Sequence, residues 1–199
     1  MITNWGEKIA RRLAASGTIL SEDIDLYGYG FFLLLSSALY LFVVAIFGSA
    51  LGIFWESILF YFMFSILREY AGGIHAKTER GCMLSTILAL LLSTVGIRGM
   101  LQAEHSTIAM MFLIVGCTVV FFFSPMDVQE KPLSINDRLY YQRISRWLAS
   151  AYALLGIWAA VVRWDILYPI AASATLEGIL IFVGTVNLGK LSRKVQDEI

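Results

Sequence analysis

The chain has 199 residues, of which 58% are hydrophobic and 15% charged, and its mean hydropathy is +0.73. These values exclude a soluble globular domain of this size and place the chain in a lipid bilayer. The 15 Lys and Arg balance the 15 Asp and Glu, so the net charge gives no reason to expect a nucleic acid as a partner.

The first 25 residues are polar and precede the apolar part of the chain. Within residues 1–25, four apolar side chains recur at helical spacing: Ile2, Trp5, Ile9 and Leu13. Three basic side chains occupy the other side of the same helix: Lys8, Arg11 and Arg12. This pattern predicts an amphipathic helix at the inner leaflet. Packing of this helix against the cytoplasmic ends of a bundle is a compatible alternative. The residues 21–25 that follow resemble a helix cap and turn.

Six apolar runs follow, and each predicts a transmembrane helix. They lie near residues 28–47, 50–67, 83–100, 107–123, 147–162 and 166–188. Several contain only about 17 residues, which is near the lower limit for crossing a hydrocarbon core roughly 30 Å thick. The first run is long enough to span the membrane, so we expect an internal anchor rather than a cleavable secretory signal. The sequence therefore predicts an all-α membrane protein with six spans.

The basic residues predict the orientation of these spans. If all six runs cross the membrane, every Lys and Arg except Arg98 and Arg163 lies on one side. Loops rich in Lys and Arg face the cytoplasm. We therefore expect both termini, and the loop at 68–82, on the cytoplasmic side of the cell membrane. No internal repeat or linker divides the chain, so a single domain of residues 1–199 is expected.

The loop at 68–82 contains the residues best suited to catalysis. His75 can accept a proton near neutral pH, and Cys82 supplies a thiol. On a continuous helix these side chains would be about 10.5 Å apart along the axis, too far for direct proton transfer. The backbone must therefore bend, and the glycines at 72, 73 and 81 permit this. We expect the second span to end near Tyr70 and Cys82 to open the third.

A cysteine at the start of a helix is chemically useful. Free N–H groups and the positive end of the helix dipole favour the thiolate and can hold an oxyanion. Ser85 and Thr86 share the helix face of Cys82, where they either position a substrate or hydrogen-bond back to the helix. Arg68 has the donors needed to bind a substrate carboxylate. Cys117 lies in an apolar run, so a disulfide with Cys82 is not expected.

Simpler interpretations compete with catalysis. A basic, glycine-containing loop between two spans is common, and the chemistry alone supports an inert loop equally well. A metal site is not expected, because only His75, Glu79 and Cys82 are close in sequence and structural zinc usually takes four ligands rich in Cys and His. Glu56 and Glu177 fall in predicted spans, where an ionisable group either lines a substrate path or is neutralised or drawn to the surface.

The string from Arg68 to Ala76, followed by Cys82 seven residues after His75, closely resembles the signature of the AgrB (accessory gene regulator B) family. The similarity extends along nearly the whole chain. Supporting elements are the approach to the first span at 21–29 and the segments Pro125-Met126-Asp127 and Lys131-Pro132-Leu133.

This resemblance implies a membrane-embedded cysteine endopeptidase of quorum sensing. Such an enzyme removes the carboxyl-terminal part of an AgrD-type propeptide through an acyl-enzyme thioester and promotes cyclisation to a thiolactone or lactone. By the same resemblance, Cys82 is the nucleophile, His75 is the general base, and Arg68 and Gly73 are needed for activity. A homodimer without a cofactor is implied. The alternative function is a peptide transporter or membrane scaffold, in which Glu56 and Glu177 mark a conduit.

Overall fold

The regular structure is helical throughout the residues that this computed structural model describes, which are 2–73, 78–126 and 134–197. The elements in chain order are α1 (Ile2–Ala15), the short 3₁₀ helix η1 (Ser21–Asp23), α2 (Ile24–Ala50), α3 (Phe54–Ala71), α4 (Glu79–Gln102), α5 (Ser106–Phe123), α6 (Ile135–Val161) and α7 (Leu167–Asp197). The predicted all-α class is confirmed.

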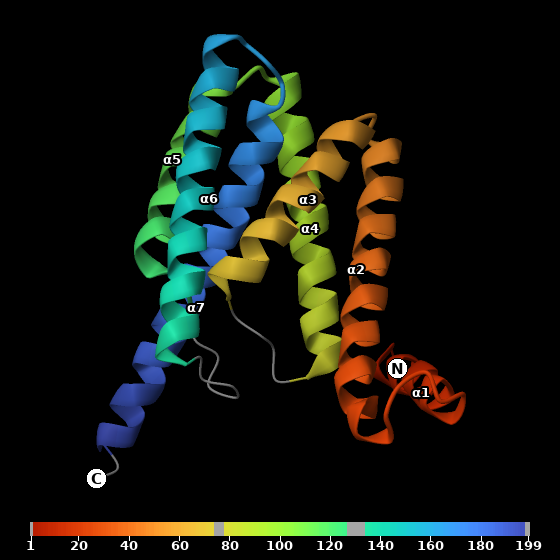
Figure 1. The fold of residues 1–199 in the computed structure, drawn as a ribbon. Helices are drawn as coiled ribbons and strands as arrows, with labels where there is room; N and C mark the ends of the chain where they lie inside the picture. The colour runs from red at the N-terminus through yellow and green to blue at the C-terminus, as the bar shows by residue number, and fades with distance from the viewer. Residues whose placement is uncertain (1, 74–77, 127–133, 198–199) are drawn as a thin grey trace.

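Five of the helices are long and apolar enough to cross a membrane, as a multi-pass membrane protein requires: α2, α4, α5, α6 and α7. The helix formed by the second apolar run, α3, is not among them. It carries Glu56, Arg68 and Glu69 within 18 residues. It also crosses the bundle obliquely instead of running along it (Figure 1).

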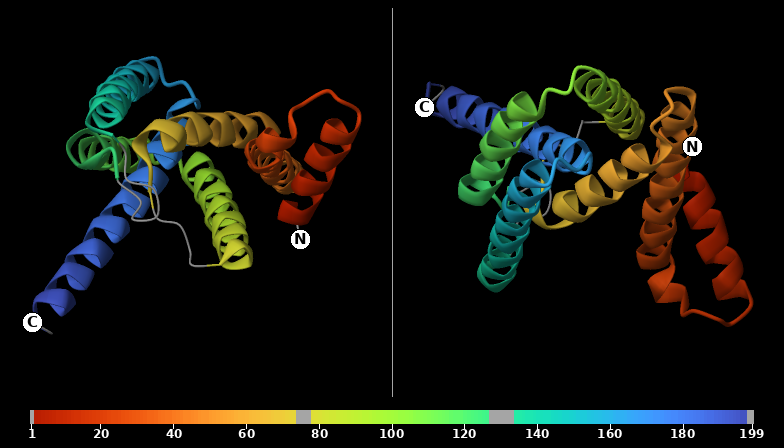
Figure 2. Two further views of the ribbon diagram at one scale, coloured as in Figure 1. Left: turned by 60° about the horizontal axis from the view of Figure 1, so that its bottom comes forward. Right: turned by 90° about the horizontal axis from the view of Figure 1, so that it is seen from above.

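The helices form two groups that α3 connects. Figure 2 shows α1 and α2 on one side and α5, α6 and α7 on the other, with α3 running between them. The two ends of the chain lie at the same end of the bundle (Figure 1). The last turn of α3 stops well short of that end, whereas α4 and α6 begin near it. The chain that follows α3 therefore starts at mid-depth in the bundle.

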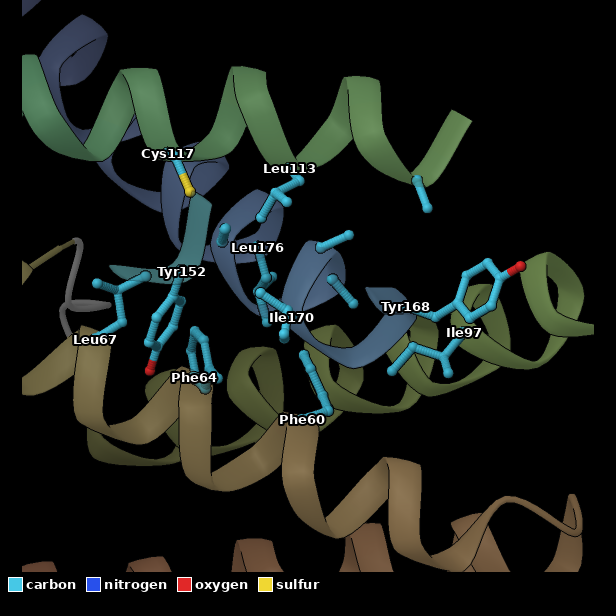
Figure 3. Packing of buried hydrophobic residues seen from close by; sticks show 14 of the residues in the cluster. Phe60, Phe64, Leu67, Ile97, Leu113, Cys117, Tyr152, Tyr168, Ile170 and Leu176 are labelled. Atoms are coloured by element: carbon cyan, nitrogen blue, oxygen red, sulfur yellow. The ribbon is translucent and has the colours of Figure 1, made fainter. Parts of the chain in front are cut away.

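The core is centred on the first half of α7. Side chains from α3, α5 and α6 pack around it, as Figure 3 shows, and the labelled ones include Phe60, Phe64, Leu113, Tyr152, Ile170 and Leu176. Large apolar side chains are exposed on the outer faces of the helices, among them Phe42, Leu92, Val115 and Leu154. In a membrane protein such faces meet lipid tails.

The contact between α5 and α7 depends on small residues. A Cβ atom added to Gly116 would lie 2.5 Å from the carbonyl oxygen of Ala174, and one added to Gly178 would lie 3.1 Å from the Cα of Gly116. Such contacts let two helix backbones approach closely, which is a common basis of helix association in membranes.

We expect the Gly116→Ala substitution to destabilise the protein by about 1–3 kcal/mol, because the new methyl group would meet backbone atoms that cannot move aside. The measurement is the thermal unfolding midpoint in detergent. Gly96→Ala in α4 is the matched control, since no atom lies within 4 Å of its added Cβ. Equal midpoints for the two variants would contradict this account of the α5–α7 contact.

The amphipathic N-terminal helix packs against the start of α2. A Cβ atom on Gly6 would lie 2.5 Å from the Gly28 carbonyl oxygen, so the two helices touch through their backbones. Ala10 is fully buried, while Trp5 is 62% exposed. The helix therefore packs on the bundle and still presents an aromatic side chain suited to a membrane interface.

Helix α6 starts at Ile135, about three turns before the apolar run at 147 that predicts this span. The cap explains the early start: the Ser134 side chain accepts a hydrogen bond from the Asp137 backbone N–H at 3.2 Å. The extra turns carry exposed polar side chains, so hydropathy alone misses them. Glu56, expected inside a span, instead lies half-exposed in the first turn of α3.

Candidate active site

Cys82 lies in the first turn of α4 and is half-buried. Thr78 caps the helix: its side chain accepts a hydrogen bond from the Gly81 N–H at 3.2 Å, and its carbonyl accepts one from the Cys82 N–H at 2.9 Å. The prediction that Cys82 opens this helix is confirmed. The thiol therefore lies at the N-terminal end of a capped helix.

Two polar neighbours on α4 differ in what they contact. The Ser85 hydroxyl donates a hydrogen bond to the Cys82 carbonyl at 3.0 Å, so it bonds back to its own helix. Thr86 is half-buried, and Tyr40 of α2 interacts electrostatically with both Thr86 and Cys82. Tyr40 sits in an apolar run, and the sequence analysis did not single it out. Helix α2 therefore contributes one side of the thiol's surroundings.

The end of α3 is held by hydrogen bonds to three successive carbonyl oxygens. Each comes from a different part of the structure: Tyr70 O accepts from Ser145 Oγ at 2.9 Å, Ala71 O from Met126 N at 3.0 Å, and Gly72 O from Arg68 Nη1 at 3.1 Å. Carbonyls at a helix end have no partner within the helix and must find one elsewhere. These three carbonyl groups at the end of α3 therefore all accept hydrogen bonds from the protein.

The two glycines after α3 are required by close contacts. Gly72 has φ +76° and pairs as a single parallel bridge with Met126, whose carbonyl oxygen would lie 2.7 Å from an added Cβ. Gly73 has φ +145°, and the guanidinium of Arg68 occupies the place that its Cβ would take. A side chain is thus excluded at both positions by conformation and by space.

Arg68 also faces a buried acid. Its Nη1 lies 3.7 Å from Oε1 of Glu177 on α7, whose side chain is 0% exposed, against 23% for Arg68. Glu177 belongs to the predicted spans, but the sequence gives no sign of its partner. The structure brings these two residues together beside the glycine pair.

Other predicted site residues lie outside the described part of the chain. His75 falls in 74–77, and Asp127 and the segment 131–133 fall in 127–133. The pairing of His75 with Cys82 therefore stays a prediction. The described boundaries around it, with α3 ending at Ala71 and α4 starting at Glu79, agree with the expected bend.

The second cysteine occupies a different environment. Cys117 of α5 is 7% exposed and packs in the core close to Tyr152 (Figure 3). Both cysteines are free. Only Cys82 is therefore accessible from the region that joins α3 to α4.

These features define a helical membrane protein with a thiol at one capped helix terminus and a glycine pair at the end of the preceding helix. A model of the family Accessory gene regulator B matches residues 6–183. The chain belongs to the AgrB family. Membership implies involvement in processing quorum-sensing peptides.

Curated relatives agree with the family assignment. The chain is similar to a protein described as AgrB-like from Clostridium perfringens (strain SM101 / Type A), with 24% identity over 190 residues that cover 90% of this chain and 87% of the relative. A second AgrB-like protein, from strain 13 of the same species, is 28% identical over 143 residues, which cover 69% and 67% of the two chains. No solved structure matches the chain.

Proposed function

We propose that this protein is a membrane-embedded cysteine endopeptidase that cleaves an AgrD-type propeptide at the cytoplasmic face of the cell membrane. The observation that carries this proposal is the position of Cys82, half-buried at the capped start of α4, in a chain of the AgrB family. A thiol in that position is favoured as a nucleophile by the helix terminus.

The reaction follows from the two proposed groups. His75 takes the Cys82 proton, and the sulfur attacks the scissile carbonyl, forming a C–S bond. The C–N bond then breaks, and His75 returns the proton to the leaving amine of the carboxyl-terminal fragment. A thiol or hydroxyl of the substrate then attacks the carbonyl of the resulting thioester and closes a thiolactone or lactone ring. The C–S bond to Cys82 breaks, and the proton of the attacking group returns to the Cys82 sulfur through His75.

Six spans and cytoplasmic termini are part of the proposal. The starts of α2 and α4 lie at the same end of the bundle (Figure 1), which supports α3 as part of the second of six crossings. That end carries both termini and most of the basic residues, which favours the cytoplasm. Residues 1–199 would then form one peptidase domain. Two copies of the chain would act together as a homodimer. Arg68 and Gly73 would support the loop, and Ser85 and Thr86 the surroundings of Cys82.

The first test uses a thiol-directed alkylating reagent on the purified protein in liposomes. We expect iodoacetamide to modify Cys82 at least about tenfold faster than Cys117, because Cys117 is packed in the core and only an accessible thiolate reacts. Peptide mass spectrometry identifies the modified residue, and cleavage of a co-reconstituted propeptide is expected to fall in proportion. Cys117→Ala is the control and should keep both properties. Full alkylation of Cys82 with unchanged cleavage would refute a role for this thiol.

A further inference from the structure

Glu177 is the buried acid that the proposed chemistry leaves unexplained. It lies in the middle of the core helix α7 with no exposed surface, and neither of its carboxyl oxygens has a hydrogen-bond partner. A buried carboxyl group without hydrogen bonds is costly, and replacing it with an apolar side chain is often neutral or stabilising. Its presence in the core therefore points to a role other than packing.

The group that faces Glu177 is the guanidinium of Arg68. The two side chains are within ion-pair distance at 3.7 Å, and Arg68 reaches Glu177 from the last turn of α3. The same Nη1 atom donates to the Gly72 carbonyl at 3.1 Å, and the guanidinium fills the space beside Gly73. Arg68 thus connects the rigid core helix to the backbone of the glycine pair.

That backbone leads directly to the proposed general base. His75 follows Gly73 by two positions in the sequence. The path of the chain at Gly72 and Gly73 is therefore the last described part of the structure before His75. A change in the orientation of the guanidinium would displace this path, because Arg68 contacts both glycines.

We propose that Glu177 is a positioning residue for the peptidase: it orients Arg68, which in turn sets the backbone path of Gly72 and Gly73 ahead of His75. Glu177 acts through Arg68 and does not touch the substrate. This inference rests on the proposed function. It adds Glu177 of α7, a residue remote from Cys82 in sequence, to the residues that support catalysis. It also gives Arg68 a structural task in place of the substrate-carboxylate contact considered from the sequence.

The test compares Glu177→Gln with the wild-type protein in liposomes that contain an AgrD-type propeptide. Gln keeps the shape of the side chain and replaces one carboxyl oxygen, an acceptor that faces Arg68, with an amide NH2 group. We expect kcat to fall by roughly tenfold to a hundredfold, as small displacements of catalytic groups do, with KM little changed. The unfolding midpoint should stay close to wild type or rise. Glu56→Gln, in the first turn of α3 at the other end of the helix, is the matched control and should have wild-type kcat.

A double-mutant cycle tests the route through Arg68. Arg68→Gln alone should lose as much kcat as Glu177→Gln, and the double variant should lose no more than either, because the two residues act as one unit. Glu177→Asp keeps the carboxyl group on a shorter side chain and should retain intermediate activity. Losses that multiply in the double variant, or a drop in the unfolding midpoint that accounts for the lost activity, would overturn the inference.

A second measurement does not need a propeptide. In a Cys117→Ala background, the rate of Cys82 alkylation should fall in Glu177→Gln, since a displaced His75 no longer assists the thiol. Continued cleavage by Cys82→Ala or His75→Ala would defeat the proposed function itself. A different result would defeat only the role of Glu177: Cys82→Ala and His75→Ala lose cleavage, while Glu177→Gln keeps the wild-type kcat and the wild-type rate of Cys82 alkylation.

Discussion

Propeptide cleavage is expected to fall by at least about a thousandfold when either Cys82 or His75 is replaced by alanine, because nucleophile and base act as a unit. The measurement is the release of the carboxyl-terminal fragment from a propeptide reconstituted with the purified protein in liposomes. The double variant should be no less active than either single variant. This non-additivity is what separates a dyad from two independent contributions to binding.

The remaining cysteine and histidine supply matched controls for this experiment. Cys117→Ala changes a thiol in the core, and His105→Ala changes an exposed residue that precedes α5 at the far end of the bundle. Both variants should cleave the propeptide at rates close to wild type. Cleavage that persists in Cys82→Ala and His75→Ala would exclude the dyad.

Gly73→Ala is expected to lower cleavage by roughly a hundredfold, since the new methyl group must displace the Arg68 guanidinium and with it the chain that leads to His75. The backbone contributes as well: φ is +145° at this position, a conformation that residues with a side chain rarely adopt. The strain should cost about 1–3 kcal/mol of stability. Activity and the unfolding midpoint are measured on the same preparation.

A second glycine separates the effect of strain from the effect of crowding. Gly52 lies in the turn between α2 and α3 with φ +71°, and no atom lies within 4 Å of an added Cβ. Gly52→Ala should therefore lower the unfolding midpoint without a matching loss of cleavage. If Gly52→Ala and Gly73→Ala lose the same fraction of activity, crowding of Arg68 does not explain the role of Gly73.

The sequence was sufficient for the helices whose apolar runs fill most of their length. The runs at 83–100 and 107–123 coincide with α4 and α5 to within about one turn. The start of α6 was missed, since its first turns are polar and depend on the Ser134 cap. The count of five clear spans against six expected has a similar cause, because the charges on α3 reduce the hydropathy of an oblique helix.

The candidate site could be predicted only where its residues are close in sequence. The position of Cys82 at a helix start followed from a geometric argument about two residues seven apart. The contacts of Arg68 with Glu177, of Ala71 with Met126 and of Tyr70 with Ser145 join distant parts of the chain. Periodicity along one sequence carries no information about such pairs.

The three separately bonded carbonyls at the end of α3 fix the chain length of this segment. Inserting or deleting one residue before Gly72 would turn the helix end by about 100° and move every oxygen away from its donor. The donors cannot follow, since they belong to α6, to the segment after α5 and to α3 itself. We therefore expect the segment from Arg68 to Gly73 to tolerate no change in length.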